Sequence, residues 1–217
     1  MRAYPLEWAD MSDFVVHFTK GSDEEDDYGN MFGIYGDHVL KPKRAFGIGR
    51  KLCPIPESQF AVCFSEIPPG EWARLAQRRE TKYGIGFRKS FVKSKGSGPI
   101  WYVLKESPQW SVLQDMMRRE TSDGAAGIWK LTPFIDAPGE YESREYFFEW
   151  EREWRHVGEF SFEPEEVAFL LIPEELHEAA RGFFEDALRE HVGPAYLCPY
   201  VDPSWDRDRI RRALRER

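Results

Sequence analysis

The run at residues 147–157, FFEWEREWRHV, constrains the fold more than any other part of this chain, because it mixes charges with large aromatic rings. The two-residue period of a strand sorts its side chains onto two faces. One face would carry Glu149, Glu151, Glu153 and Arg155, and the other Trp150, Arg152, Trp154 and His156. Because Trp, Phe and Val favour a pleated surface, the run predicts a strand.

Three carboxylates on one strand face repel each other, and two interpretations of them stay open. In the first, they lie on a solvated sheet face where Arg152 and Arg155 balance the acids. In the second, they line a cleft in which one carboxylate is desolvated and oriented for chemistry.

The composition bounds the class of protein. Of 217 residues, 41% are hydrophobic and 15% aromatic, which is enough to build a core. The net charge of −8 argues against nucleic-acid binding driven by overall charge. One local basic patch, formed by Arg88, Lys89, Lys93 and Lys95, would allow contact with nucleic acid as a substrate.

Three cysteines, Cys53, Cys63 and Cys198, make an odd number without paired spacing, which is typical of a reducing compartment. No apolar run is long enough to span a bilayer, and the first residues do not resemble a signal peptide. We therefore expect a cytoplasmic protein without a membrane partner. The five histidines are scattered, so we expect no metal site.

The order of the predicted elements favours an α+β fold with a mixed, mainly antiparallel sheet and flanking helices. We predict strands at residues 14–20, 60–66, 83–87, 99–104, 147–157, 167–173 and 195–198. We predict helices at residues 30–40, 72–81, 88–95, 110–120, 174–191 and 206–217. The length indicates a single domain over residues 1–217, with a motif-bearing core at about 14–172 and an extension at about 173–217.

Glycines alternate with larger residues at 83–87, YGIGF, and so remove the side chains from one face of the predicted strand. Such a bare face permits the close approach of a ligand or of another backbone. It is equally typical of a tight contact between a helix and a sheet, and the sequence does not separate the two.

Five runs occur in a fixed order: His17-Phe18-Thr19, CFSEIP at 63–68, YGIGF at 83–87, PIWYV at 99–103 and EREWR at 151–155. In this order the chain resembles the AbiGi-like family of abortive phage-resistance proteins over about residues 14–157. The resemblance implies a role in bacterial phage defence. It also implies an antitoxin whose partner is a toxin or a phage component.

A more distant likeness concerns chemistry. A His on the first strand, then a Tyr and then a Glu, is similar to the arrangement in ADP-ribosyltransferase folds, which implies NAD as a co-substrate. Its catalytic residues would be Glu153, which would stabilise an oxocarbenium-like cation, and Glu151, which would orient the acceptor. The cofactor-binding residues would be His17, Thr19, Tyr83 and Gly84. The chain departs from that pattern because the Ser-Thr-Ser segment of one branch is absent.

Two functions from different classes therefore compete. The leading hypothesis is an NAD-consuming ADP-ribosyltransferase with an unknown acceptor. The alternative is a non-catalytic antitoxin or sensor, in which residues 149–155 form an ion-paired structural strand and Trp150 and Trp154 pack the core. A metal-dependent nuclease is less favoured, because carboxylates along one strand point in parallel and seldom converge on one ion.

Overall fold

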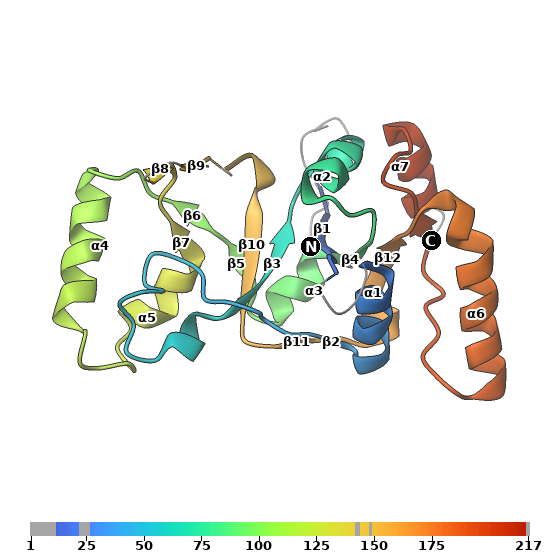
Figure 1. Ribbon diagram of the computed structural model, residues 1–217, viewed down its shortest axis with the longest axis horizontal. Coiled ribbons are helices and arrows are strands. Elements are labelled where there is room, and N and C mark those ends of the chain that lie inside the picture. The colour runs from blue at the N-terminus through green and yellow to red at the C-terminus, as the bar shows by residue number, and fades with distance from the viewer. Residues whose placement is uncertain (1–11, 22–26, 142–143, 148, 216–217) are drawn as a thin grey trace. The chain divides into compact units, whose positions relative to one another are not determined.

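The computed structural model describes residues 12–21, 27–141, 144–147 and 149–215 (Figure 1). The chain divides into two compact units, each built from separate stretches of sequence. The first unit comprises Met1–Val39, Glu66–Phe91 and Ser161–Arg217. The second unit comprises Leu40–Ser65 and Val92–Phe160. The chain passes between the units at four points, three of them within short elements: β2 (Val39–Leu40), α3 (Lys89–Ser94) and β11 (Phe160–Ser161). The fourth lies between Ser65 and Glu66.

The first unit combines four strands of the main sheet with helices. Its strands are β1 (Phe14–Phe18), β4 (Gly84–Arg88), β12 (Val167–Leu171) and β13 (Tyr200–Val201). Its helices are α1 (Asp27–Asp37), α2 (Trp72–Arg79), α6 (His177–Glu190) and α7 (Arg207–Arg215). The strand order is β13-β12-β4-β1. The β12–β13 pair is parallel and the other two pairs are antiparallel, so the sheet is mixed.

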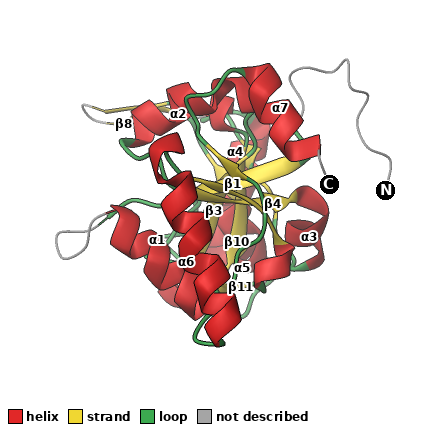
Figure 2. Ribbon diagram, turned by 90° about the vertical axis from the view of Figure 1, so that its right-hand side faces the viewer, coloured by secondary structure: helices red, strands yellow, loops and turns green. Residues whose placement is uncertain are grey.

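The core of the first unit forms where α2 and α7 cover this sheet (Figures 1 and 2). Its buried members are Val16, Ile67, Trp72, Leu75, Phe169, Leu171, Val201 and Ile210. Trp72 stacks on Phe169 with 4.8 Å between ring centroids, and its indole N–H donates to the Ile67 carbonyl at 3.0 Å. The indole is thus buried with its polar atom satisfied.

The bare glycine face of β4 is filled by a neighbouring side chain. A Cβ added to Gly86 would lie 2.2 Å from Cζ of Phe169 on β12, so only glycine leaves room for this ring. Of the two uses that the sequence left open, close packing is therefore the one seen at Gly86, although the neighbour is a strand and not a helix.

The second unit contains short strands and helices. Its strands are β3 (Ala61–Ser65), β5 (Gly98–Pro99), β6 (Trp101–Tyr102), β7 (Ile135–Asp136), β8 (Gly139–Tyr141), β9 (Arg144–Tyr146) and β10 (Glu153–Val157). Its helices are α4 (Pro108–Arg119) and α5 (Ile128–Leu131). Strand β10 pairs antiparallel with both β3 and β5.

The local sequence determines where helix α4 begins and which of its faces is buried. The Ser107 side chain accepts a hydrogen bond from the Trp110 N–H at 3.1 Å and Pro108 occupies the first turn, so the start is capped. Leu113 and Met117, four residues apart, are buried on one helical face and pack in a cluster with Trp129 of α5.

The α+β class and the mixed, mainly antiparallel sheet predicted from the sequence are confirmed. The prediction of one strand over residues 147–157 is wrong. Glu149–Glu151 forms a 3-10 turn, Arg152 has a φ of 47°, and the strand begins only at Glu153. Glu149 and Glu151 therefore do not continue the strand face of Glu153.

Two other strand predictions also need correction. The strand expected at 195–198 is instead β13 (Tyr200–Val201), on the other side of Pro199. The strand expected at 99–104 is divided between β5 and β6, which pair with different neighbours. Among the described residues, no helix has both the length and the apolar character needed to cross a bilayer.

Candidate functional site

Strand β10 buries an arginine inside the second unit. Because Glu153 and Arg155 are two residues apart, they share one face of β10, and the Arg155 side chain is wholly buried. Its Nε donates to Oε1 of Glu153 at 2.8 Å, and its Nη2 donates to Oε2 at 3.2 Å. Both carboxylate oxygens of Glu153 thus accept hydrogen bonds from one guanidinium.

The rest of this guanidinium is held by the segment that leads into β7. Arg155 Nη1 donates to the Pro133 carbonyl at 2.7 Å, and Nη2 donates to Oδ2 of Asp136. The other Asp136 oxygen lies 3.8 Å from Nη1 of Arg50, which is partly exposed. We call Glu153, Asp136, Arg155 and Arg50 the Arg155 cluster; it balances two carboxylates with two guanidinium groups.

The electrostatics of the cluster follow from burial and from the paired charges. Burial alone would lower the pKa of Arg155, but the negative charges of Glu153 and Asp136 outweigh it and raise that pKa, so the guanidinium stays charged. Burial, followed by the charge of Glu153, raises the pKa of the Cys63 thiol well above its usual value. The same two causes raise the pKa of the Tyr102 hydroxyl. Both neighbours therefore remain neutral near pH 7.

The predicted catalytic residues lie in this unit. Glu153 is 8% exposed and Glu151 is 4% exposed at the end of the 3-10 turn. A carboxylate that stabilises an oxocarbenium ion needs charge that is not already compensated. The charge of Glu153 is already compensated by Arg155, which favours a structural role for this carboxylate. The catalytic assignment stays a prediction.

The four predicted cofactor-binding residues lie together in the first unit. His17 and Thr19 are at the end of β1, whereas Tyr83 and Gly84 are at the start of β4. The Thr19 N–H donates to the Tyr83 carbonyl at 3.1 Å, and the Thr19 carbonyl accepts from the Thr81 hydroxyl at 2.6 Å. A Cβ on Gly84 would lie 2.9 Å from the His17 carbonyl. These contacts fix the two strand ends together, and the NAD assignment of the four residues stays a prediction.

One of the four cations in the predicted basic patch, Lys89, is buried. Lys89 is 6% exposed, and its ammonium lies 2.7 Å from Oε1 of the buried Glu66. Lys93, by contrast, is exposed and lies over the Trp154 ring at 5.5 Å. Lys89 therefore adds no exposed cation to the patch, and a nucleic-acid contact through Arg88, Lys93 and Lys95 stays a prediction.

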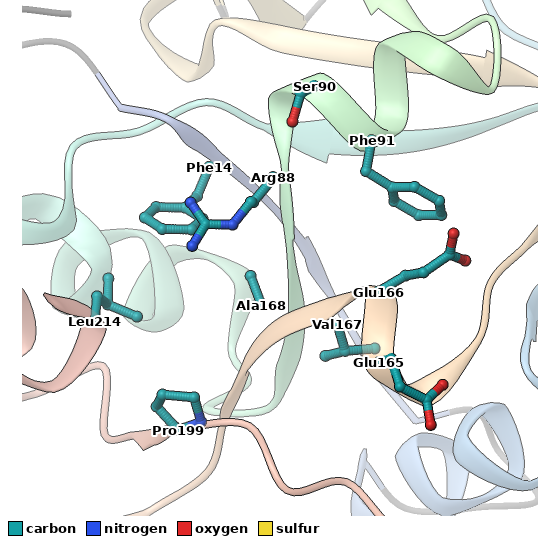
Figure 3. A pocket seen from close by; sticks show the side chains of 10 residues that line it. All are labelled: Phe14, Arg88, Ser90, Phe91, Glu165, Glu166, Val167, Ala168, Pro199 and Leu214. Atoms are coloured by element: carbon teal, nitrogen blue, oxygen red, sulfur yellow. The ribbon is translucent and has the colours of Figure 1, made fainter. Parts of the chain in front are cut away.

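A pocket of about 260 Å³ opens beside β1, β4 and β12 in the first unit (Figure 3). Arg88 lies over the Phe14 ring at 5.3 Å, and the Glu166 carboxylate points toward the Phe91 ring, whereas Glu165 extends away from it. Glu166 accepts a hydrogen bond from the Glu163 N–H at 2.9 Å, so it closes the turn that precedes β12. The pocket is lined by one cation, Arg88, and two acids, Glu165 and Glu166, so its charges do not select one class of ligand.

Sequence reasoning missed Asp136, Arg50 and the Pro133 carbonyl, which complete the Arg155 cluster. These residues lie far along the chain from β10, and no local pattern connects them. The chain also lacks any grouping of three or more His, Cys, Asp or Glu side chains that could hold a metal ion, within the residues that the structure describes.

Comparison with known families now identifies the chain's relatives. The family model described as "Putative abortive phage resistance protein AbiGi, antitoxin" matches residues 43–181, more than half of the chain. The chain belongs to the AbiGi family. The match contains the CFSEIP, YGIGF and EREWR runs but not His17-Phe18-Thr19. No curated protein and no solved structure matches the chain.

This membership confirms the family resemblance and connects the chain with abortive phage resistance. The region common to the family begins later and ends later than the sequence resemblance indicated. It includes every member of the Arg155 cluster. It does not include α1 or the C-terminal half of α6.

Proposed function

We propose that this chain is the antitoxin of a two-protein abortive-infection system and that it acts by binding its toxin and not by catalysis. Membership of a family described as an antitoxin carries the proposal. The Arg155 cluster supports it, because the carboxylate best placed in the sequence for NAD chemistry is bound through both oxygens by an internal arginine.

The partner would be a protein whose activity harms the cell when the antitoxin is missing. A net charge of −8 suits a basic partner better than an acidic one, since opposite charges speed association and like charges oppose it. A phage component is the other partner class that the family description accommodates, and the experiment below separates the two.

The test uses a genomic fragment that carries this gene with its neighbours, introduced into a host that lacks the system. A stop codon at Trp72 removes α2 and everything after it. If the chain is an antitoxin, the fragment with the stop codon should give far fewer viable transformants than the intact fragment. Supplying the intact chain from a second plasmid should restore them.

The same experiment has outcomes that contradict the proposal. An NAD-consuming toxin would show the reverse pattern, in which the stop codon relieves toxicity. A sensor of a phage component would leave transformation unchanged and would affect only plaque formation. In the restored cells, a tagged copy of the chain should co-purify with one product of the same fragment in a fixed ratio.

A further inference from the structure

An apolar groove of about 330 Å³ runs between α1 and α6 in the first unit, and the two helices lie side by side in both views (Figures 1 and 2). Phe32, Tyr35 and Gly36 come from α1, and Phe183, Phe184 and Ala187 come from α6. The segment after α6 closes one end with Val192 and Pro194. We call this the α1–α6 groove.

Aromatic rings form the walls of the groove and leave apolar surface in contact with water. Phe32 packs edge-on against Phe183 with 5.2 Å between centroids, and Phe183 packs in the same way against Phe184 at 5.4 Å. Phe183 nevertheless remains 53% exposed and Val192 73% exposed. Contiguous exposed apolar surface of this kind, with a concave shape and aromatic anchors, is typical of a protein-binding site.

The α1 side of the groove is open down to the backbone. Apart from the adjacent residues and the backbone of α1 itself, no atom lies within 4 Å of the position that a Cβ on Gly36 would take, and Gly36 lines the groove. Glycine weakens a helix relative to alanine, so this position does not serve the stability of α1. A bare backbone permits the close approach of a partner's main chain.

The charge on the groove restricts the partner. Among the residues that the structure describes, the charged ones that line the groove are the acids Asp186 and Glu190, and none is a lysine or arginine. Arg189 binds Asp186 at 2.6 Å, so Glu190 carries the larger part of the uncompensated charge. A segment that fits here therefore needs an apolar face with a lysine or arginine beside it.

The position of the groove in the sequence adds a separate argument. Its lining residues fall at 32–36 and 183–194, on both sides of the family match at 43–181. The region shared by the family thus contains the whole Arg155 cluster but none of the residues that line the groove. A surface that must recognise one particular toxin is expected to differ between family members in this way.

We propose that the α1–α6 groove holds an amphipathic helix of the toxin, with bulky apolar side chains at i and i+3 or i+4 against Phe32 and Phe183. Lysine or arginine on the flank of that helix pairs with Glu190. This inference rests on the antitoxin function proposed above. It adds the surface that binds the toxin and the chemistry of the segment that enters it.

The test repeats the rescue experiment with variants supplied from the second plasmid. Gly36→Arg places a long cation in the open groove without a clash, because the Cβ position is free. We expect it to weaken toxin binding by about a hundredfold, in the range of a central interface residue, and to abolish rescue. Glu190→Lys should reduce rescue less.

Two variants control for effects outside the groove. Gly33→Arg changes the same helix at a position that is equally open but does not line the groove. Leu188→Arg changes an exposed apolar residue of α6 that also lies outside it. Both should rescue like the unchanged chain, and no variant should unfold at a lower urea concentration than the unchanged chain, because arginine is a better helix former than glycine.

The outcomes separate the inference from the function on which it rests. If the unchanged chain fails to rescue, the proposed function fails. If the unchanged chain and Gly36→Arg rescue equally, the function stands and the groove inference is overturned. A concentration-dependent dimer of the unchanged chain in sedimentation, lost in Gly36→Arg, would assign the groove to a second copy and would also overturn it.

Discussion

The Arg155 cluster and the α1–α6 groove differ in the kind of residue that builds them. In the cluster, charged side chains of the second unit lie inside the protein, and each polar atom of Arg155 meets a fixed partner. In the groove, Phe183 of the first unit remains 53% exposed and Phe32 is half-buried. Buried charge is costly unless it is fully paired, whereas exposed apolar surface is costly unless a partner covers it. The Arg155 cluster therefore resembles a structural element of the fold, and the α1–α6 groove resembles an interface.

The largest expected effect tests the scaffold side of this comparison. Arg155→Met removes the cation and leaves the carboxylates of Glu153 and Asp136 buried without it. We expect a loss of about 3–5 kcal/mol in the free energy of unfolding, measured with urea. Arg50→Ala removes a partly exposed cation 3.8 Å from Asp136 and should cost about 1 kcal/mol or less. A loss of about 1 kcal/mol or less in Arg155→Met would mean that the cluster does not hold the unit together.

A smaller effect contrasts two glycines of the first unit. Gly86→Ala drives a methyl group into the Phe169 ring and should cost roughly 1–3 kcal/mol by overpacking. Gly36→Ala meets open space in a helix and should stabilise the chain by up to about 1 kcal/mol. The unfolding midpoints in urea should therefore move in opposite directions. A loss of stability in Gly36→Ala would show that the groove is filled in the free protein.

A pH effect of smaller size is expected at His156. Burial, with the nearby charge of Lys95, lowers its pKa below the usual value of 6.5, although the bond to the Glu159 carbonyl opposes this. Below that usual value the unfolded chain therefore binds a proton that the folded chain binds less well. The contribution of neutral His156 to the free energy of unfolding should be fully present above pH 6.5 and should be lost as the pH falls below that value.

The control for this pH effect is His156→Gln, which keeps a polar group beside Ser97 and cannot take up the proton. The fall in the urea midpoint between neutral and mildly acidic pH should become shallower in this variant. If the two pH profiles have the same slope, other groups cause the acid sensitivity.

The smallest expected effect is none. Titration of NAD into the purified chain should give no saturable heat up to about 1 mM, a concentration at which even weak specific sites bind. Binding that is weakened by Tyr83→Ala and retained by Glu153→Gln would contradict this expectation. It would favour the ADP-ribosyltransferase hypothesis over the antitoxin hypothesis. It would also assign a ligand site to the end of β1 and the start of β4.

The fold was largely predictable because most elements have local signals. The apolar runs of β3 and β12, and the spacing of Leu113 and Met117 in α4, identified these elements. The 147–157 run misled because alternation cannot reveal a residue with positive φ, and Arg152 adopts one. That single backbone state turns Glu151 out of register with Glu153.

The sites were less predictable, since long-range partners decide them. Nothing within β10 indicates that Asp136 and the Pro133 carbonyl will meet Arg155. The alternative of an ion-paired strand was right for Glu153 and Arg155, and for Trp154, which is 4% exposed. It was wrong for Trp150, which is 42% exposed. The groove carried no recognisable motif, because it joins two helices about 150 residues apart.

The segmented construction of the first unit has a consequence for synthesis on the ribosome. All residues of the second unit have been made once Phe160 has been added, whereas the first unit still lacks Ser161–Arg217. Until β12 arrives, the Phe169 ring cannot cover Gly86, and until α6 arrives the groove has only one wall. Nascent chains halted before residue 161 therefore carry the Arg155 cluster but no proposed toxin-binding surface. The proposed toxin binding would then depend on completed translation, so a cell whose protein synthesis is interrupted would at once stop making chains with a complete groove.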